Sequence, residues 1–234
     1  MNAKRLTLVA TVLLTPGGLF AQKEQQVFKF DNLTKIGGMK VKIEGNPSVI
    51  ASSVGKAIEF DGVDDAIFFP DRPLVGAKAF TIEAIFRPMG GAFMQRWMHI
   101  AETDPATGQD SGPAGVPDPN PRYLFEIRVV NDSWYLDGFI SSKAGSKALA
   151  FPNKLYPLNT WYAVEQTYDG KVYRIYVNGE LQGEDAVETY VPHGKGHMMI
   201  GTRINRVNYF HGDVAKARFT SRALPPSKFM KVPQ

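Results

Sequence analysis

Three aspartates stand close together in the stretch AIEFDGVDDAIFF, at Asp61, Asp64 and Asp65. Carboxylates at this spacing supply the hard oxygen ligands that Ca²⁺ prefers. The same residues are also ordinary turn formers, because Asp bonds to its own backbone and the Gly after Asp61 tolerates a positive φ. The spacing favours a turn between two strands, with a calcium site as the alternative.

A second set of polar residues alternates with apolar ones in short segments. In FTIEAIFRP, the residues Ile82, Ala84 and Phe86 suit a core, which leaves Glu83 pointing the other way. The same alternation in the neighbouring segments predicts the side chains that face away from the core. They are Glu83, Trp97, His99, Glu126, Arg128, Glu165, Arg174 and Tyr176.

The hairpin signal in WYAVEQTYDGKVYRIYV predicts a register as well as a face. A two-residue loop at Asp169-Gly170 would place Val164 opposite Ile175 in the core. It would also place Glu165 opposite Arg174 on the other face, as a cross-strand ion pair.

Acids, a histidine, guanidinium groups and aromatic rings on one sheet face are a set that suits sugars. Carboxylates and guanidinium forks bind hydroxyls or uronates, while Trp97 or Tyr176 stacks on the apolar face of a sugar ring. The plain alternative is a solvated outer face, because charged side chains are the default on exposed sheets. We therefore predict that the set shares one concave, carbohydrate-binding surface, and hold solvated surface as the alternative.

Short β-branched and aromatic runs separated by turn residues supply the elements that would position this set. VFKF, MKVKIE, YLFEIRVV, WYLDGFI and HMMIGT are examples, and no segment has a convincing helical period. The tail ALPPSKFMKV has room for one helical turn at most. Regular strands of this kind predict an all-β antiparallel sandwich or jelly roll.

Composition narrows the function classes. The 234 residues carry 27 Lys and Arg against 23 Asp and Glu, and they include no cysteine. This small positive excess, without a basic stripe, argues against nucleic acid as a partner. The absence of cysteine excludes disulfides and thiolate metal sites.

The first 21 residues read as a signal peptide. Lys4 and Arg5 precede a short apolar run from Leu6 to Leu14, and LFAQ offers a cleavage point between Ala21 and Gln22. That run is too short to span a bilayer. We expect an exported, secreted or periplasmic protein with one domain over residues 22–234 and no membrane insertion.

One long interruption, TDPATGQDSGPAGVPDPNP, runs from Thr103 to Pro121. A loop of this length in a compact domain is usually functional or disordered, and its prolines favour an extended path over the surface. We consider a loop that walls a binding site and a neutral insertion equally.

Four segments carry a family resemblance, and they occur in the expected order. They are GKAIEFDGVDDAIFFP, FTIEAIFRP, WYAVEQTYDGKVYRIYVNGEL and MMIGTRINRVNYFHGDVAKARFTSRAL. Together they resemble a laminin-G-like, concanavalin A-like jelly roll over about Val27 to Leu224. The resemblance implies two packed antiparallel sheets and a frequent role in binding glycans or proteins outside cells, although a fold alone does not fix a function.

The resemblance also bears on the three aspartates. In the family, the FDG-x-DD loop often lies near a calcium that takes a further ligand from a C-terminal motif, which here reads GDVAKAR. The acidic pair of that motif falls on Ala215 and Lys216, and Asp213 stands two positions earlier. Because Ca²⁺ wants six to eight oxygens, we predict a turn that binds no cofactor, and keep Asp61, Asp64, Asp65 and Asp213 as the calcium alternative.

Three function classes remain open. The first is a lectin-like module that binds a polysaccharide or other glycan, with acidic glycans among the candidates. The second is a polysaccharide lyase or hydrolase on the same face, in which His99, Arg128 and Tyr176 would supply the base and the cation. The E-x-D-x-x-E motif of jelly-roll glucanases is absent. The third class is an extracellular adhesion or assembly domain.

Overall fold

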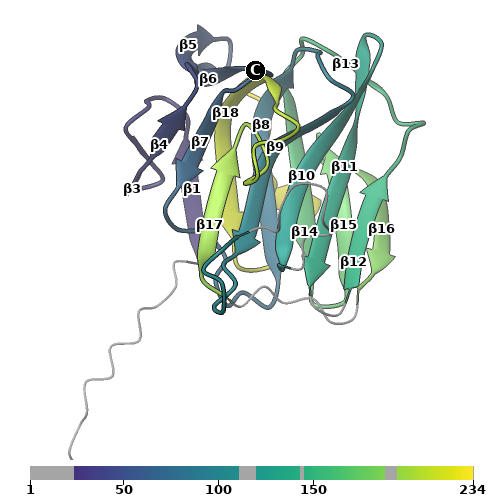
Figure 1. The fold of residues 1–234 in the computed structure, drawn as a ribbon. Helices are drawn as coiled ribbons and strands as arrows, with labels where there is room; N and C mark the ends of the chain where they lie inside the picture. The colour runs from purple at the N-terminus through teal and green to yellow at the C-terminus, as the bar shows by residue number, and fades with distance from the viewer. Residues whose placement is uncertain (1–23, 111–119, 143–144, 188–193, 234) are drawn as a thin grey trace, which may run out of the picture.

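Two large antiparallel sheets pack face to face in this computed structural model, which describes residues 24–110, 120–142, 145–187 and 194–233 (Figure 1). The first, here called the β8 sheet, has the order β16 (Glu180–Ala186), β15 (Val172–Val177), β14 (Tyr162–Tyr168), β8 (Phe80–Pro88), β18 (His211–Thr220), β6 (Gly55–Asp61) and β5 (Ser48–Ser52), with β1 (Gln25–Lys29) also beside β18.

The second, here called the β10 sheet, has the order β12 (Gly145–Ala150), β11 (Ser133–Ser142), β10 (Arg122–Val130), β9 (Met94–Glu102), β17 (Gly196–Ile200), β7 (Ala66–Phe69) and β4 (Lys42–Glu44), with β13 (Tyr156–Pro157) beside β11. A small hairpin joins β2 (Lys35–Ile36) to β3 (Met39–Lys40). The predicted all-β antiparallel sandwich is confirmed. The signal-peptide residues 1–21 lie outside the described residues.

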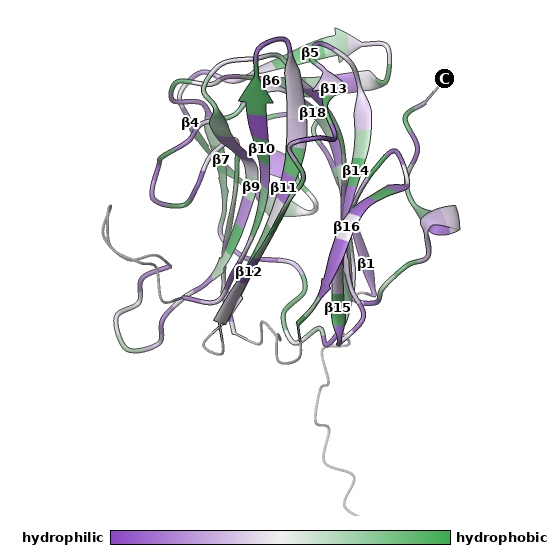
Figure 2. Cartoon of the chain, turned by 90° about the vertical axis from the view of Figure 1, so that its right-hand side faces the viewer, coloured by the Kyte–Doolittle hydropathy of each residue, from purple (hydrophilic) through white to green (hydrophobic). Residues whose placement is uncertain are grey.

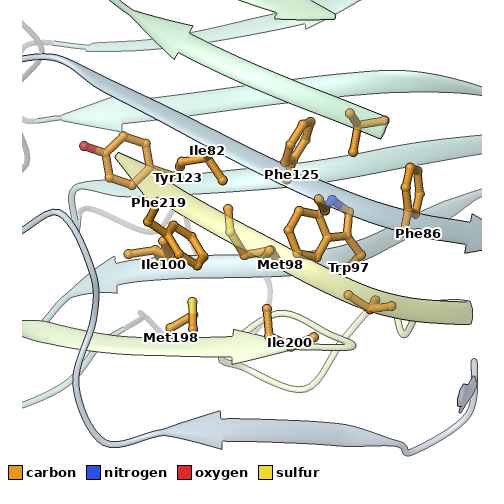
Figure 3. Close-up of a cluster of buried hydrophobic side chains, with 14 of the residues drawn as sticks. Ile82, Phe86, Trp97, Met98, Ile100, Tyr123, Phe125, Met198, Ile200 and Phe219 are labelled. Atoms are coloured by element: carbon orange, nitrogen blue, oxygen red, sulfur yellow. The ribbon is translucent and has the colours of Figure 1, made fainter. Parts of the chain in front are cut away.

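The core fills the space between the sheets, and it combines aromatic side chains with aliphatic and Met side chains (Figure 3). Trp97 lies there, fully buried, with its ring 5.3 Å from Phe125 and 6.4 Å from Phe86. The prediction that Trp97 is an exposed stacking platform is therefore wrong. A β-bulge between β9 and β10 is the reason, because it inserts Trp97 as an extra residue beside Met98 and turns both side chains inward.

The β14–β15 hairpin has a longer turn than the sequence suggests. Tyr168 pairs with Tyr173, and the Asp169 carboxylate accepts the backbone N–H of Val172 at 2.8 Å, so four residues make the turn. The register consequently shifts by two positions, and Glu165 lies opposite Tyr176 rather than Arg174. Val164 likewise lies opposite Val177. A shift of two preserves the faces, because side chains alternate with period two.

The C-terminal segment runs along the outer side of the β8 sheet, away from the β10 sheet (Figure 2). After β18 it forms one 3₁₀ turn, Pro226–Lys228, in agreement with the single turn predicted for this tail. Phe229 then packs edge-on against Tyr176, with ring centroids 5.0 Å apart. The Met230 N–H donates a 2.7 Å hydrogen bond to Glu83. This segment therefore covers part of one outer face.

Among the described residues, no helix has the length and apolar character needed to cross a bilayer.

Candidate functional site

The predicted carbohydrate-binding set is divided between two outer faces. Strands β8, β14 and β15 belong to one sheet, whereas β9 and β10 belong to the other. Glu83, Glu165, Arg174 and Tyr176 therefore lie on the β8 sheet, and His99, Glu126 and Arg128 lie on the β10 sheet. The prediction of one shared surface is wrong, because alternation along a strand assigns a face but does not assign a sheet.

On the β8 sheet, the chain itself satisfies or covers most of this chemistry. The Arg218 guanidinium forms a bidentate pair with the buried Glu83 carboxylate, and its Nη2 also donates to the Lys228 carbonyl at 2.7 Å. Arg174 pairs with Asp169 and Glu184 at 2.7 and 2.6 Å on the solvated surface. These groups hold the hairpin and the C-terminal segment in place.

Glu165 is the exception on that face. Its carboxylate is fully buried beside Glu83, and among the described residues neither of its oxygens has a hydrogen-bond partner. Burial, followed by the neighbouring Glu83 charge, raises the pKa of Glu165 to about 8. Glu165 therefore keeps its proton to a higher pH than an ordinary carboxyl group does.

The outer face of the β10 sheet carries a denser polar network. Glu126 on β10 lies between Arg96 on β9 and Asp137 on β11 in the strand register. Arg96 donates to Glu126 at 2.8 Å, and Arg128 reaches Glu126 at 2.9 Å and Asp137 at 2.6 Å. Burial is the larger cause and the charge of Glu126 the smaller, and together they raise the pKa of Asp137 to about 6, although Arg128 and Arg96 act to lower it. Arg96, Glu126 and Asp137 thus form a row across three strands, and Arg128 pairs with both carboxylates of that row.

Several atoms of this network remain without a protein partner. Among the described residues, Arg96 Nη1, Asp137 Oδ1 and His99 Nε2 are buried and make no hydrogen bond. A buried polar group without a partner costs about 1–3 kcal/mol, so a face with three such atoms is suited to a bound water or a polar ligand. Two of the atoms are donors and one is an acceptor, which matches the hydroxyls of a polyol.

The histidine on this face has a defined tautomer. His99 Nδ1 accepts the Ile204 N–H at 3.0 Å, so the proton of the neutral ring is on Nε2. Burial and the positive charges of Arg203, Arg122 and Arg96 hold the pKa of His99 well below its usual value. The unpaired nitrogen is therefore a donor. The predicted catalytic trio of His99, Arg128 and Tyr176 is wrong on two counts, since His99 offers no free basic nitrogen and Tyr176 lies on the other sheet.

Loops bound this face at two sides. The Arg96 N–H donates to the Asn208 carbonyl at 3.0 Å, which seats the segment 201–210 over β9 and β17. On the other side, the Phe93 side chain is 54% exposed, and the Arg128 guanidinium lies 5.8 Å from its ring centroid. Met94, opposite Arg128 in the register, is also exposed. The network thus opens toward an aromatic and aliphatic edge, which we call the Phe93 edge.

Sequence reasoning missed Arg96, Asp137 and Phe93. The bulge at Trp97 reverses the alternation that would have identified Arg96. Asp137 left a signal, because an acid stands inside the otherwise apolar run WYLDGFI. Phe93 stands just before β9, where alternation does not apply.

The aspartate loop has turn chemistry. Asp61 Oδ1 accepts the backbone N–H groups of Val63, Asp64 and Asp65 at 2.8, 3.2 and 3.3 Å. The two oxygens of Asp65 accept the N–H groups of Asn46 and Asp61 at 2.6 and 3.0 Å. Within the described residues, these three aspartates offer carboxylate oxygens within 4.8 Å of one another.

Asp213 does not belong to that group, so the structure does not support it as a further calcium ligand at the loop. It is buried on the β8 sheet and pairs with Arg87 at 2.5 Å.

The Pro-rich loop is described only in part. Asp110 accepts a hydrogen bond from Thr103 and lies 2.6 Å from His197 Nδ1, which ties the start of the loop to β17. Residues 111–119 lie outside the described residues, so its suggested role as the wall of a binding site stays a prediction.

Comparisons with known proteins agree with this architecture. A family model described as the concanavalin A-like lectin/glucanases superfamily matches residues 61–228. A comparison with curated protein sequences gives no significant match.

Among solved structures, domain 4 of AbnA, an extracellular GH43 arabinanase from Geobacillus stearothermophilus in complex with arabinotriose, is similar with a TM-score of 0.59 and 16% identity. That alignment covers 87% of this chain and 94% of the domain. The binding domain of Paraclostridial Mosquitocidal Protein 1 is similar with a TM-score of 0.60 and 12% identity, over 87% of this chain and 50% of that one. NanB sialidase from Streptococcus pneumoniae gives a TM-score of 0.57 and 15% identity, over 81% and 28%. At identities this low, the structural similarity shows a shared fold and nothing further.

Proposed function

Because this chain belongs to the concanavalin A-like lectin/glucanases superfamily, we propose that it binds a polysaccharide on the outer face of the β10 sheet. The observation that carries the proposal is the set of buried, unpartnered donors and acceptors on Arg96, His99 and Asp137. Sugar hydroxyls both donate and accept, so one pyranose or furanose ring can complete several of these bonds at once.

The Phe93 edge supplies the second element of sugar recognition. Aromatic rings bind the apolar face of a sugar while nearby polar groups fix its orientation. Phe93 and Arg128 lie side by side, and Arg128 is the most exposed member of the charged row. A sugar ring stacked on Phe93 would therefore place its substituents beside the Arg128 guanidinium.

The charge on this face favours an acidic glycan. Arg128 is the most exposed charged side chain of the network and lies at the Phe93 edge. A uronate or sulfate would accept from its guanidinium fork in bidentate fashion. The similarity to an arabinanase domain in complex with arabinotriose supports carbohydrate binding in general, while the preference for acid rests on these residues.

A polysaccharide panel tests this function directly. We expect the chain to bind an acidic polysaccharide, and Arg128→Ala to weaken that binding by roughly 1.5–3 kcal/mol, the scale of a charge-assisted hydrogen bond. The affinity for a neutral glycan should fall much less. Arg174→Ala is the matched control, because this arginine also has two acidic partners but lies on the other sheet. Equal weakening by both substitutions would refute the assignment of the face.

One observation favours a second candidate, a glycan-cleaving enzyme on the same face. Glu126 and Asp137 are directly opposite on neighbouring strands, and the pKa of Asp137 is raised to about 6. Glycosidases use two carboxyl groups, of which the general acid has a raised pKa. Incubating the panel with the protein and measuring new reducing or unsaturated ends distinguishes the two. Product formed by the wild-type chain but not by Glu126→Gln favours the enzyme, and binding without product favours the lectin.

We also propose that the protein is exported, to a secreted or periplasmic location. The support is the charged and apolar pattern of residues 1–21. Mass spectrometry of the exported protein should find Gln22 at its N-terminus. An exported chain that still begins at Met1 would contradict this proposal.

A further inference from the structure

A separate cavity of about 440 Å³ lies on the outer side of the β8 sheet, beneath the C-terminal segment. Strands β1, β6, β8 and β18 contribute to it, and the C-terminal segment contributes Met230, Lys231 and Pro233. Apolar and charged side chains line it. The cavity has no part in the site on the β10 sheet.

The floor of this cavity is aliphatic. Ile85 and Ala215 belong to a small apolar cluster on the outside of the sheet, and Val54 and Met230 pack against it. An aliphatic floor binds an aliphatic body through the hydrophobic effect. Met230 adds a flexible thioether side chain that adapts to the shape of a bound group. The backbone N–H of Met230 is fixed to Glu83, so this wall is anchored.

The rim of the cavity is cationic. Lys29, Lys56, Lys216 and Lys231 come from four different segments, against one acid, Asp31. Within the described part of the chain, none of these four lysines forms an ion pair with a carboxylate. Charges of one sign around a low-dielectric hollow raise the local concentration of the opposite ion. The rim therefore selects an anion.

We propose that this cavity binds an amphiphilic anion, a molecule with a short aliphatic body and one terminal carboxylate, sulfate or phosphate group. The body would rest on Ile85, Ala215 and Met230, and the anionic group would lie among the lysines. No aromatic ring and no side-chain hydroxyl or amide is among the lining residues, so the cavity lacks the groups that recognise sugars. Its volume is within the range of small-molecule sites.

Decanoate is a suitable probe, with octyl glucoside as a neutral amphiphile for comparison. Calorimetric titration of the full chain with decanoate, below its micellar concentration, should give saturable one-to-one binding. Octyl glucoside should give none. Lys216→Glu should weaken decanoate binding by at least about tenfold, through loss of a charge-assisted contact and added repulsion. Lys171→Glu is the matched control, because Lys171 is exposed, carries the same charge and lies outside the cavity.

A second variant separates the floor from the rim. Ala215→Leu fills the cavity without changing its charge, and it should also weaken decanoate binding at least about tenfold, because the aliphatic body loses its buried apolar contact. Lys216→Gln serves if the charge reversal impairs folding, as judged from the melting curve. Absence of saturable binding to the wild-type chain would overturn the proposal, as would equal effects of Lys216→Glu and Lys171→Glu. Binding of anionic lipid vesicles without binding of decanoate would also overturn it, because the lysines would then bind a membrane surface and not a small anion in the cavity.

Discussion

The two outer faces of the sandwich carry similar residues but treat them differently. On the β8 sheet, the buried carboxylate of Glu83 is closed by Arg218 and by the backbone of the C-terminal segment. Glu165, the unpartnered acid on the same sheet, lies in the register between Glu83 and Tyr176, the two residues that the C-terminal segment contacts. On the β10 sheet, Arg96 and Asp137 each keep a buried atom without a partner among the described residues. A charge that the chain itself neutralises serves the fold, whereas a polar atom left open leaves room for a ligand. Charge alone therefore does not locate a binding site.

The largest expected effect concerns Glu83, on the outer face of the β8 sheet. Glu83→Ala leaves the Arg218 guanidinium and the Met230 N–H without their acceptor, and breaking a buried ion pair costs roughly 3–5 kcal/mol. Urea unfolding should show this loss, while glycan affinity stays unchanged because the other face is untouched. Arg174→Ala, which breaks a solvated pair, should cost less than about 1 kcal/mol. A Glu83→Ala variant with full stability and weakened glycan binding would reverse the roles of the two faces.

Glu165, on the same face, makes the stability of the fold depend on pH. Its pKa is about 8 in the folded chain, against an ordinary value near 4.5. Between these two values the folded state holds a proton that the unfolded state releases, so stability falls as pH rises from about 5 to about 8. Glu165→Gln mimics the protonated form and should flatten this part of the profile.

Chemical unfolding of wild type and Glu165→Gln at pH 5, 7 and 9 checks that expectation. The variant should exceed wild type most at pH 9. Parallel pH profiles for the two proteins would show that Glu165 is already ionised in the folded state.

A smaller effect is expected at the Phe93 edge. Phe93→Ala removes the proposed stacking surface and should weaken glycan binding by about 1–2 kcal/mol, the scale of an aromatic contact. Stability should hardly change, because the ring is 54% exposed. Phe93→Tyr keeps the ring and should retain binding. If Phe93→Ala binds like wild type, the sugar does not reach this edge.

The smallest effect is expected from a chelator. The aspartate loop is held by its own backbone bonds, so EDTA should change neither the melting temperature nor glycan affinity. If calcium were bound there at a hundred times its Kd, its removal would cost about 2.7 kcal/mol of stability. A melting temperature that falls by several degrees would assign a metal to Asp61, Asp64 and Asp65.

The sequence predicts features that depend on the local pattern along one strand, but it does not predict features that depend on pairing between distant strands. Alternation identified the strands and the outward direction of Glu83, Glu126 and Arg128, since these depend on neighbours along one strand. It could not show that β8 and β10 lie in different sheets, because strand order is set by pairing between distant segments. The bulge at Trp97 and the four-residue turn at Asp169 depend on such pairing as well.

Mapping a bound glycan by NMR tests the central claim most directly. The experiment titrates the ¹⁵N-labelled chain over residues 22–234 with the acidic oligosaccharide that binds best in the panel. We predict that amide shifts concentrate at residues 93–96, 126–128 and 135–137, at the row of charges and the Phe93 edge. Shifts concentrated instead on β8, β14 and β15 would contradict the account, because the ligand would then occupy the face that the chain closes for itself.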